Sequence, residues 1–100
     1  MMDDDFFPET VELPIDGVLD LHQFRPKDIP NLLLDYLSLC QERGILQVRI
    51  IHGKGKGVLR RTVHAHLQRM EIVAGFRLAG PDGGEWGATL VNLRPPVKEA

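Results

Sequence analysis

The feature that most constrains the fold is a stretch in which a strand pattern passes through alternating glycines into a helical pattern. Residues 47–52 are rich in β-branched side chains, and apolar residues recur at helical spacing from residue 58 onward. Between these segments, Gly53, Gly55 and Gly57 allow positive φ angles and a close approach of a ligand to the backbone. A loop that enters a helix in this way presents unpaired N–H groups at the positive end of the helix dipole.

This strand–loop–helix geometry favours the binding of phosphate or another oxyanion. Two lysines in the loop and two arginines just after it add positive charge. The glycine spacing is neither that of a Walker loop nor that of a dinucleotide fingerprint, and a plain structural turn is the alternative for the loop alone. The candidate phosphate- and nucleic-acid-binding residues are Gly53, Lys54, Gly55, Lys56, Gly57, Arg60 and Arg61.

A second informative stretch, residues 18–22, alternates like a strand. The alternation places Asp20 and His22 on one face and Leu19 and Leu21 on the other. Polar side chains at the end of an otherwise apolar strand are unusual, so Asp20 and His22 are candidates for a functional role. The alternative is a purely structural role, in which Asp20 accepts backbone N–H groups and His22 is a buried, hydrogen-bonded histidine.

The whole pattern predicts an α/β fold, an α+β sandwich with the order β-α-β-α-β-β. The crossover between the first two strands is long enough to make them parallel. Gly75 suggests an irregularity in the third strand. Two further leucines widen the apolar stripe of the first helix, so cover on more than one side is expected. The predicted strands are residues 18–22, 47–52, 72–79 and 88–93, and the predicted helices run from about 28 to 44 and from 58 to 69.

If the first two strands are parallel, their carboxyl ends meet at one edge of the sheet. Asp20, His22 and His52 should then converge beside the glycine–lysine loop, and these three are the candidate catalytic residues. Histidine is suited to proton transfer near neutral pH. Asp20 could orient His22 or hold a divalent metal such as Mg²⁺, but a single carboxylate makes a poor two-metal site. His64 and His66 are expected to be surface or partly buried helix residues.

Charge is unevenly distributed, although the net charge is only −2. The first sixteen residues hold six acids and no base, and the remainder holds eight acids against twelve bases. We therefore divide the chain into an acidic N-terminal arm (1–16), one domain (17–95) and a short tail (96–100). Phe6 and Phe7 in the arm are candidates for docking on the domain or on a protein partner.

Cys40 is the only cysteine, which excludes a disulfide within the chain and a cysteine-based metal site. It falls in the pattern of the first helix, where a buried, inert thiol is expected. No apolar run approaches the length of a membrane span, and the acidic N-terminus is unlike a signal peptide. The expected location is cytoplasmic. Trp86, in a glycine-rich loop, is a candidate for base stacking or for closing a core edge.

Three motifs together resemble the small MutS-related (Smr) domain, in its stand-alone form. The resemblance covers about residues 17–94 and implies a four-stranded mixed sheet with two helices, similar to the C-terminal domain of translation initiation factor three. It also implies nucleic-acid binding, with nicking or RNA-cleaving activity in some members. The motifs are Leu19-Asp20-Leu21-His22, the run from Ile50 through His52-Gly53-Lys54-Gly55 to Arg60, and Gly84-Glu85-Trp86-Gly87-Ala88-Thr89.

The resemblance carries the family's Leu-Asp-x-His motif onto Leu19, Asp20 and His22, and its glycine loop onto residues 52–55. The chain departs from the family pattern at Gln23, where glycine is usual. The resulting hypothesis is a nucleic-acid-binding domain with endonuclease activity. A non-catalytic DNA- or RNA-binding module and a protein-interaction adaptor are the alternatives, and the choice between DNA and RNA stays open.

Overall fold

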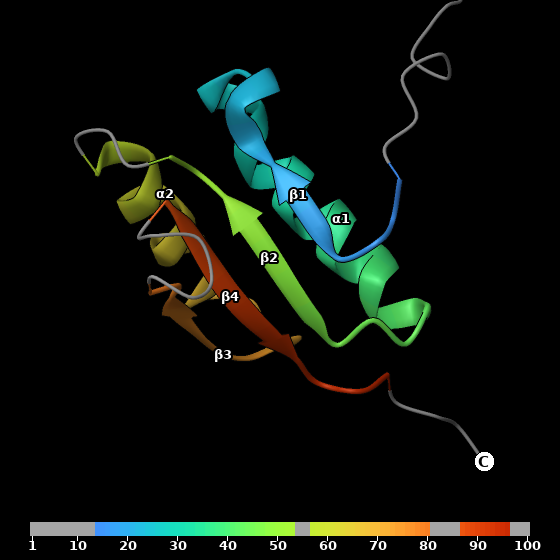
Figure 1. Cartoon of the computed structure of the whole chain (residues 1–100). Helices are drawn as coiled ribbons and strands as arrows, with labels where there is room; N and C mark the ends of the chain where they lie inside the picture. The colour runs from blue at the N-terminus through green and yellow to red at the C-terminus, as the bar shows by residue number, and fades with distance from the viewer. Residues whose placement is uncertain (1–13, 54–56, 81–86, 97–100) are drawn as a thin grey trace, which may run out of the picture.

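The computed structural model describes residues 14–53, 57–80 and 87–96. The described elements follow the predicted order β-α-β-α-β-β, with two 3₁₀ turns before the first helix (Figure 1). None of the described helices is long and apolar enough to cross a membrane. The elements are β1 (Val18–Asp20), 3₁₀ turns Leu21–Gln23 and Pro26–Asp28, α1 (Ile29–Glu42), β2 (Gln47–Ile51), α2 (Val58–Leu67), β3 (Val73–Leu78) and β4 (Ala88–Leu93).

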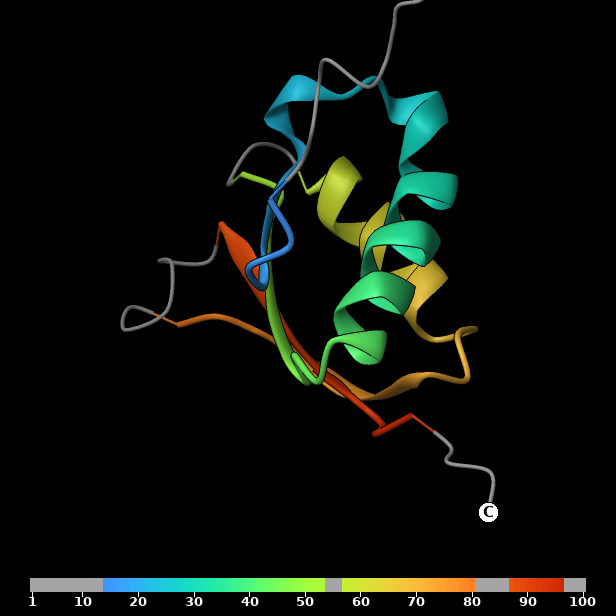
Figure 2. The ribbon, with the colours of Figure 1, turned by 90° about the vertical axis from the view of Figure 1, so that its right-hand side faces the viewer.

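The four strands form one mixed sheet in the order β1-β2-β4-β3. β1 is parallel to β2, as the crossover length predicts, whereas β4 is antiparallel to both of its neighbours. Both helices lie on the same face of the sheet (Figure 2). In the β1–β2 register Asp20 pairs with Ile51, so the last residues of the two strands lie side by side.

The core fills the space between the sheet and the two helices. Alternate residues of β2 and the inward stripe of α1 contribute fully buried side chains, among them Val48, Ile50, Leu33 and Leu37. Cys40 is buried in the same stripe, and burial raises the pKa of its thiol, so the expectation of a buried thiol is confirmed. Its raised pKa keeps the sulfur protonated and unreactive.

Two features of the helical and strand predictions are wrong. Leu34 and Leu39 are 48% and 38% exposed, because α1 is an outer layer that contacts the sheet along one stripe only. The first strand ends at Asp20 and not at His22, because an Asp20 carboxylate oxygen accepts the backbone N–H of His22 at 2.9 Å and bends the chain into a 3₁₀ turn. The irregularity expected at Gly75 is present as a register shift in β3.

Tyr36 of α1 anchors the start of β1. Its hydroxyl accepts the backbone N–H of Gly17 at 3.2 Å and lies 3.0 Å from the carbonyl oxygen of Val18, to which it donates. Gly17 has φ = 92°, a conformation that glycine adopts without strain. One helical side chain therefore holds the turn from which the short strand β1 begins.

We expect Tyr36→Phe to lower the free energy of unfolding by about 1–3 kcal/mol, because it leaves the Gly17 N–H and the Val18 carbonyl without their partner. Urea denaturation followed by circular dichroism measures this change. Leu34→Ala, at an exposed position of the same helix, is the control and should cost less than about 0.5 kcal/mol. Equal effects of the two substitutions would contradict the anchoring role.

Candidate functional site

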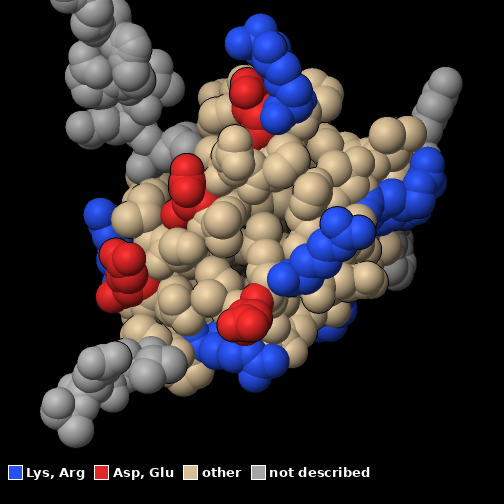
Figure 3. Space-filling view, turned by 180° about the vertical axis from the view of Figure 1, so that it is seen from behind, with Lys and Arg blue, Asp and Glu red and all other residues tan. Residues whose placement is uncertain are grey.

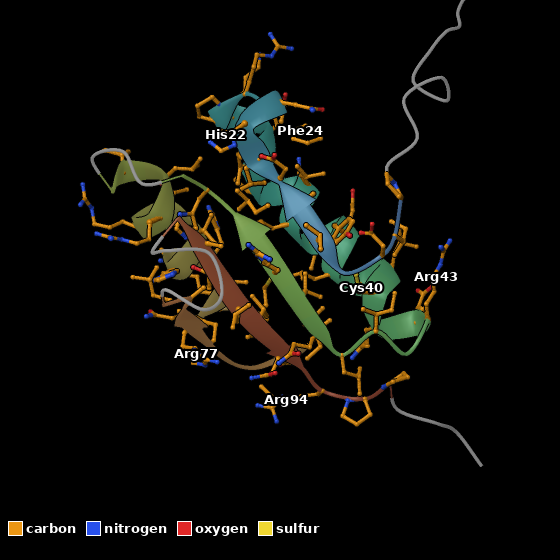
Figure 4. All side chains as sticks on the ribbon, in the orientation of Figure 1. His22, Phe24, Cys40, Arg43, Arg77 and Arg94 are labelled. Atoms are coloured by element: carbon orange, nitrogen blue, oxygen red, sulfur yellow. The ribbon has the colours of Figure 1, made fainter. Side chains whose placement is uncertain are left out.

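The candidate site lies at the end of the sheet where β1 and β2 stop and where α2 begins. Figure 4 shows His22 at this end, beyond the last residue of β1. His52 and Gly53 follow β2 directly, and Gly57 is the N-cap of α2. Parallel pairing of the two strands therefore brings residues from distant parts of the chain to one edge.

Asp20 and His22 form an exposed hydrogen-bonded pair. Nδ1 of His22 lies 2.7 Å from Oδ1 of Asp20, and the same oxygen accepts the backbone N–H of His22. This backbone hydrogen bond, aided by the ring contact, lowers the pKa of Asp20, although partial desolvation opposes the shift. The carboxylate therefore stays ionised and can only accept. It follows that Nδ1 carries the proton and that neutral His22 has its free lone pair on Nε2.

Gly53 makes room for the imidazole of His22. It has φ = 87°, and a Cβ at this position would lie 3.0 Å from Nε2 of His22. The backbone N–H groups of Gly53 and His52 both donate to the carbonyl of Gly87, at 2.9 and 3.0 Å. The N–H of Gly53 is therefore already engaged within the protein.

His52 is buried, unlike His22, with 5% of its surface exposed. Its Nδ1 lies 3.0 Å from the carbonyl oxygen of Gly53 and its Nε2 lies 2.9 Å from Oγ1 of Thr89. Burial lowers the pKa of His52, the Gly53 carbonyl partly opposes this shift, and the charges of Arg60 and His22 add to it. The ring is therefore held neutral, with both nitrogens engaged.

Positive charge gathers at the start of α2. Gly57 has φ = 83°, and it provides no side-chain hydrogen bond to cap the first N–H groups of the helix. A Cβ on Gly57 would lie 2.8 Å from Nη2 of Arg60 and 3.3 Å from Nη1 of Arg61, so both guanidinium groups fold back over this end. Seen from behind, a stripe of basic side chains runs along the side on which α2 lies (Figure 3), and the basic side chains within α2 other than histidine are Arg60 and Arg61.

Comparison with known proteins agrees with this architecture. The model of the Smr domain family matches residues 19–94. This chain belongs to the Smr domain family. Endonuclease MutS2 of Caldicellulosiruptor saccharolyticus is 39% identical over 89 residues, which cover 86% of this chain and 10% of that protein. This Smr domain thus spans about a tenth of the length of the curated relatives that it matches.

Two solved structures share the fold. The crystal structure of the Smr domain of Thermus thermophilus MutS2 superposes with a TM-score of 0.74 and 32% identity, covering 79% of this chain and 99% of that one. YdaL, described as a stand-alone small MutS-related protein from Escherichia coli, gives a TM-score of 0.73 and 25% identity, covering 86% of this chain and 70% of its own. The predicted mixed sheet with two helices is therefore confirmed.

The structure brings several of the sequence-predicted site residues of this Smr domain together. Asp20, His22 and Gly53 form one group, His52 lies beneath it in the core, and the two arginines surround Gly57. The remaining candidates lie outside the described residues. They are Lys54, Gly55, Lys56 and Trp86, together with Phe6 and Phe7 of the arm.

Sequence reasoning missed Thr89 and the role of His64. Nε2 of His64 lies 2.7 Å from Oγ1 of Thr89, so this hydroxyl joins two histidine rings whose centroids are 6.2 Å apart. Thr89 is fully buried. A signal was available, because the alternation of β4 places Thr89 on the same inward face as two apolar residues, Val91 and Leu93.

The described residues contain no group of metal ligands: among residues 14–53, 57–80 and 87–96, no three His, Cys, Asp or Glu side chains are grouped so that they could hold a metal ion. The described carboxylate at the site edge is that of Asp20, and its Oδ1 is engaged with His22. That Asp20 holds a divalent metal stays a prediction.

We expect Gly53→Ala to displace the His22 ring, because the added methyl group would occupy the space beneath Nε2. Gly44→Ala is the matched control, since Gly44 also has a positive φ of 78° but has no atom within 4 Å of its would-be Cβ. Both variants should lose about 1–2 kcal/mol from backbone strain. Only Gly53→Ala should move the His22 ring resonances in an NMR spectrum, and equal movement in both variants would contradict the proposed packing.

Proposed function

We propose that this Smr domain binds nucleic acid at the start of α2 and cleaves a phosphodiester bond with the Asp20–His22 pair. The observation that carries the proposal is the 2.7 Å contact between Nδ1 of His22 and the Asp20 carboxylate. This contact orients the imidazole and leaves a lone pair on Nε2 at an exposed position. The same logic, a carboxylate that fixes the tautomer of a basic imidazole, operates in other hydrolytic enzymes.

In the proposed step, Nε2 of His22 accepts a proton from the nucleophile, which in hydrolysis is a water molecule. The oxygen then bonds to phosphorus while the bond from phosphorus to the leaving sugar oxygen breaks, the leaving oxygen takes up a proton from solvent water, and the His22 imidazolium later returns its proton to solvent. Asp20 stabilises the imidazolium that forms. No step is routed through a metal ion. We assign the base to His22 and not to His52, because both ring nitrogens of His52 have partners inside the protein.

Phosphate binding is assigned to the first turn of α2. The N–H groups at the helix start and the guanidinium groups of Arg60 and Arg61 provide partial and full positive charge at one place. Gly53 has a different task in this proposal, since its N–H donates to the Gly87 carbonyl. Similarity to relatives named Endonuclease MutS2 supports nucleic-acid chemistry, although this chain spans only a tenth of the length of such a relative.

We expect His22→Ala to lower the cleavage rate by about 10²- to 10⁴-fold while leaving nucleic-acid affinity nearly unchanged, because the base is lost but the arginines remain. Asp20→Asn should act in the same direction. The assay presents supercoiled plasmid and structured RNA to the full chain, with magnesium or with a chelator.

The matched control for this assay is His66→Ala, which removes a partly exposed histidine elsewhere on α2 and should cleave like the wild type. Equal cleavage by His22→Ala and the wild type would contradict the catalytic assignment. Binding without cleavage by every protein would instead support a non-catalytic module.

We expect the double variant Arg60→Ala/Arg61→Ala to bind nucleic acid more weakly and with a shallower salt dependence. Loss of two phosphate contacts should reduce the slope of log affinity against log salt by about 1.4 for single strands and about 1.8 for duplex DNA. Filter-binding titrations over a range of salt concentrations measure the slope. Arg43→Ala/Arg69→Ala removes the same charge at exposed positions elsewhere and should keep the wild-type slope; an equal reduction would contradict the assigned site.

A further inference from the structure

Thr89 links two histidines in the interior of this Smr domain. Its hydroxyl oxygen lies 2.9 Å from Nε2 of His52 and 2.7 Å from Nε2 of His64. The three residues come from β4, from the residue after β2 and from the middle of α2. Thr89 has no exposed surface, so water does not compete for these hydrogen bonds.

The direction of each hydrogen bond that links His64, Thr89, His52 and Gly53 follows from which of these groups can donate and which can only accept. The Gly53 carbonyl only accepts, so Nδ1 of His52 must carry a proton and donate across their 3.0 Å contact. Nε2 of neutral His52 then has only a lone pair, and the Thr89 hydroxyl must donate to it. The hydroxyl has no second proton, so towards His64 it accepts, and His64 carries its proton on Nε2.

The environment keeps both rings in the neutral forms that this pattern needs. Burial lowers the pKa of His52 and of His64, and the charge of Arg60 lowers both further. His64 is also held in place by the ring of Phe76, with centroids 4.8 Å apart. A hydroxyl is required at residue 89, because the isosteric valine would leave two imidazole nitrogens without a partner.

We propose that Thr89 and His64 are positioning residues that hold the His52 ring in place, in the tautomer that the Gly53 carbonyl requires, and through its Nδ1–H hold the orientation of that carbonyl. Gly53 is the residue over which His22 lies, and its φ of 87° begins the segment that leads to α2. We call the hydrogen-bonded series His64–Thr89–His52 the relay. It connects α2 and β4 to the candidate site from inside the core. Its consequence for activity rests on the proposed function, whereas its consequence for His52 does not.

The first test is the tautomer of each histidine, read by long-range ¹H–¹⁵N NMR of the ¹⁵N-labelled full chain at neutral pH. The wild type should show His52 protonated at Nδ1 and His64 at Nε2. Thr89→Val should leave Nε2 of His52 without its hydrogen-bond donor and should therefore shift the ¹⁵N resonance of Nε2, whereas Thr89→Ser, which keeps the hydroxyl, should preserve the wild-type spectrum. An unchanged His52 Nε2 resonance in folded Thr89→Val would overturn the proposal.

A second pair of variants guards against a failure of Thr89→Val to fold. His64→Phe keeps the ring that packs on Phe76 but removes the donor, and His64→Gln keeps a donor at a similar reach. Only His64→Phe should perturb the His52 resonances, because the Thr89 hydroxyl is then free to turn. Equal spectra for the two variants would overturn the role of His64.

The functional arm uses a fluorescent single-stranded oligonucleotide and supercoiled plasmid. Thr89→Val should lose about tenfold in affinity or cleavage, which corresponds to the loss of the one hydrogen bond that Thr89 donates to His52, and Thr89→Ser should retain both. A wild type that neither binds nor cuts defeats the proposed function, while the NMR result still decides the relay. A wild type that is active, together with an equally active Thr89→Val whose His52 Nε2 resonance has shifted, overturns the link to the site.

Discussion

The site depends on the parallel pairing of β1 and β2. This pairing sets Asp20 beside Ile51, so the segment after each strand continues from the same edge of the sheet. β1 has only three residues, and its register is held by the burial of Leu19 and by the Tyr36 hydroxyl at its start. A slip of one residue would turn Asp20 into the core and Leu19 outward. The energetic cost of that exchange specifies where Asp20 lies.

Burial divides the polar groups near this edge into two classes with different chemistry. The exposed pair of Asp20 and His22 leaves one imidazole nitrogen without a described partner, and such a nitrogen can exchange a proton with a ligand or with water. The buried chain from His64 through Thr89 to His52 satisfies each of the contacting atoms internally. In a low-dielectric interior, such a saturated network is rigid, because breaking any one bond leaves a polar group unpaired. The interior histidines therefore suit positioning, and the surface histidine suits proton transfer.

Most of the fold could be predicted from sequence, because strand alternation, helical spacing and crossover length are local signals. The bounds of β4 and the parallel pairing followed from these signals directly. The end of β1 could not, because a side chain of Asp20 competes there with the strand ladder for the N–H of His22. The contact between His64 and Thr89 joins residues 25 apart, and periodicity alone does not report which helix face meets which strand. What the sequence does offer is the hydroxyl of Thr89 on the inward face of a strand, because a buried hydroxyl there needs a hydrogen-bond partner.

The two described glycines of the loop motif perform a task that motif spacing does not reveal. At Gly53 the space of the missing side chain borders an imidazole, and at Gly57 it borders two guanidinium groups. Glycine thus serves here to let functional side chains lie close to the backbone, in addition to permitting positive φ. Between Gly57 and Leu67 the sequence has two arginines and no acid, and the carboxylate of Asp20 is already engaged with His22. In the proposed function, a phosphate that approaches this end of α2 would therefore encounter these two arginines with no acid of α2 competing, and Gly57 makes room for both of them.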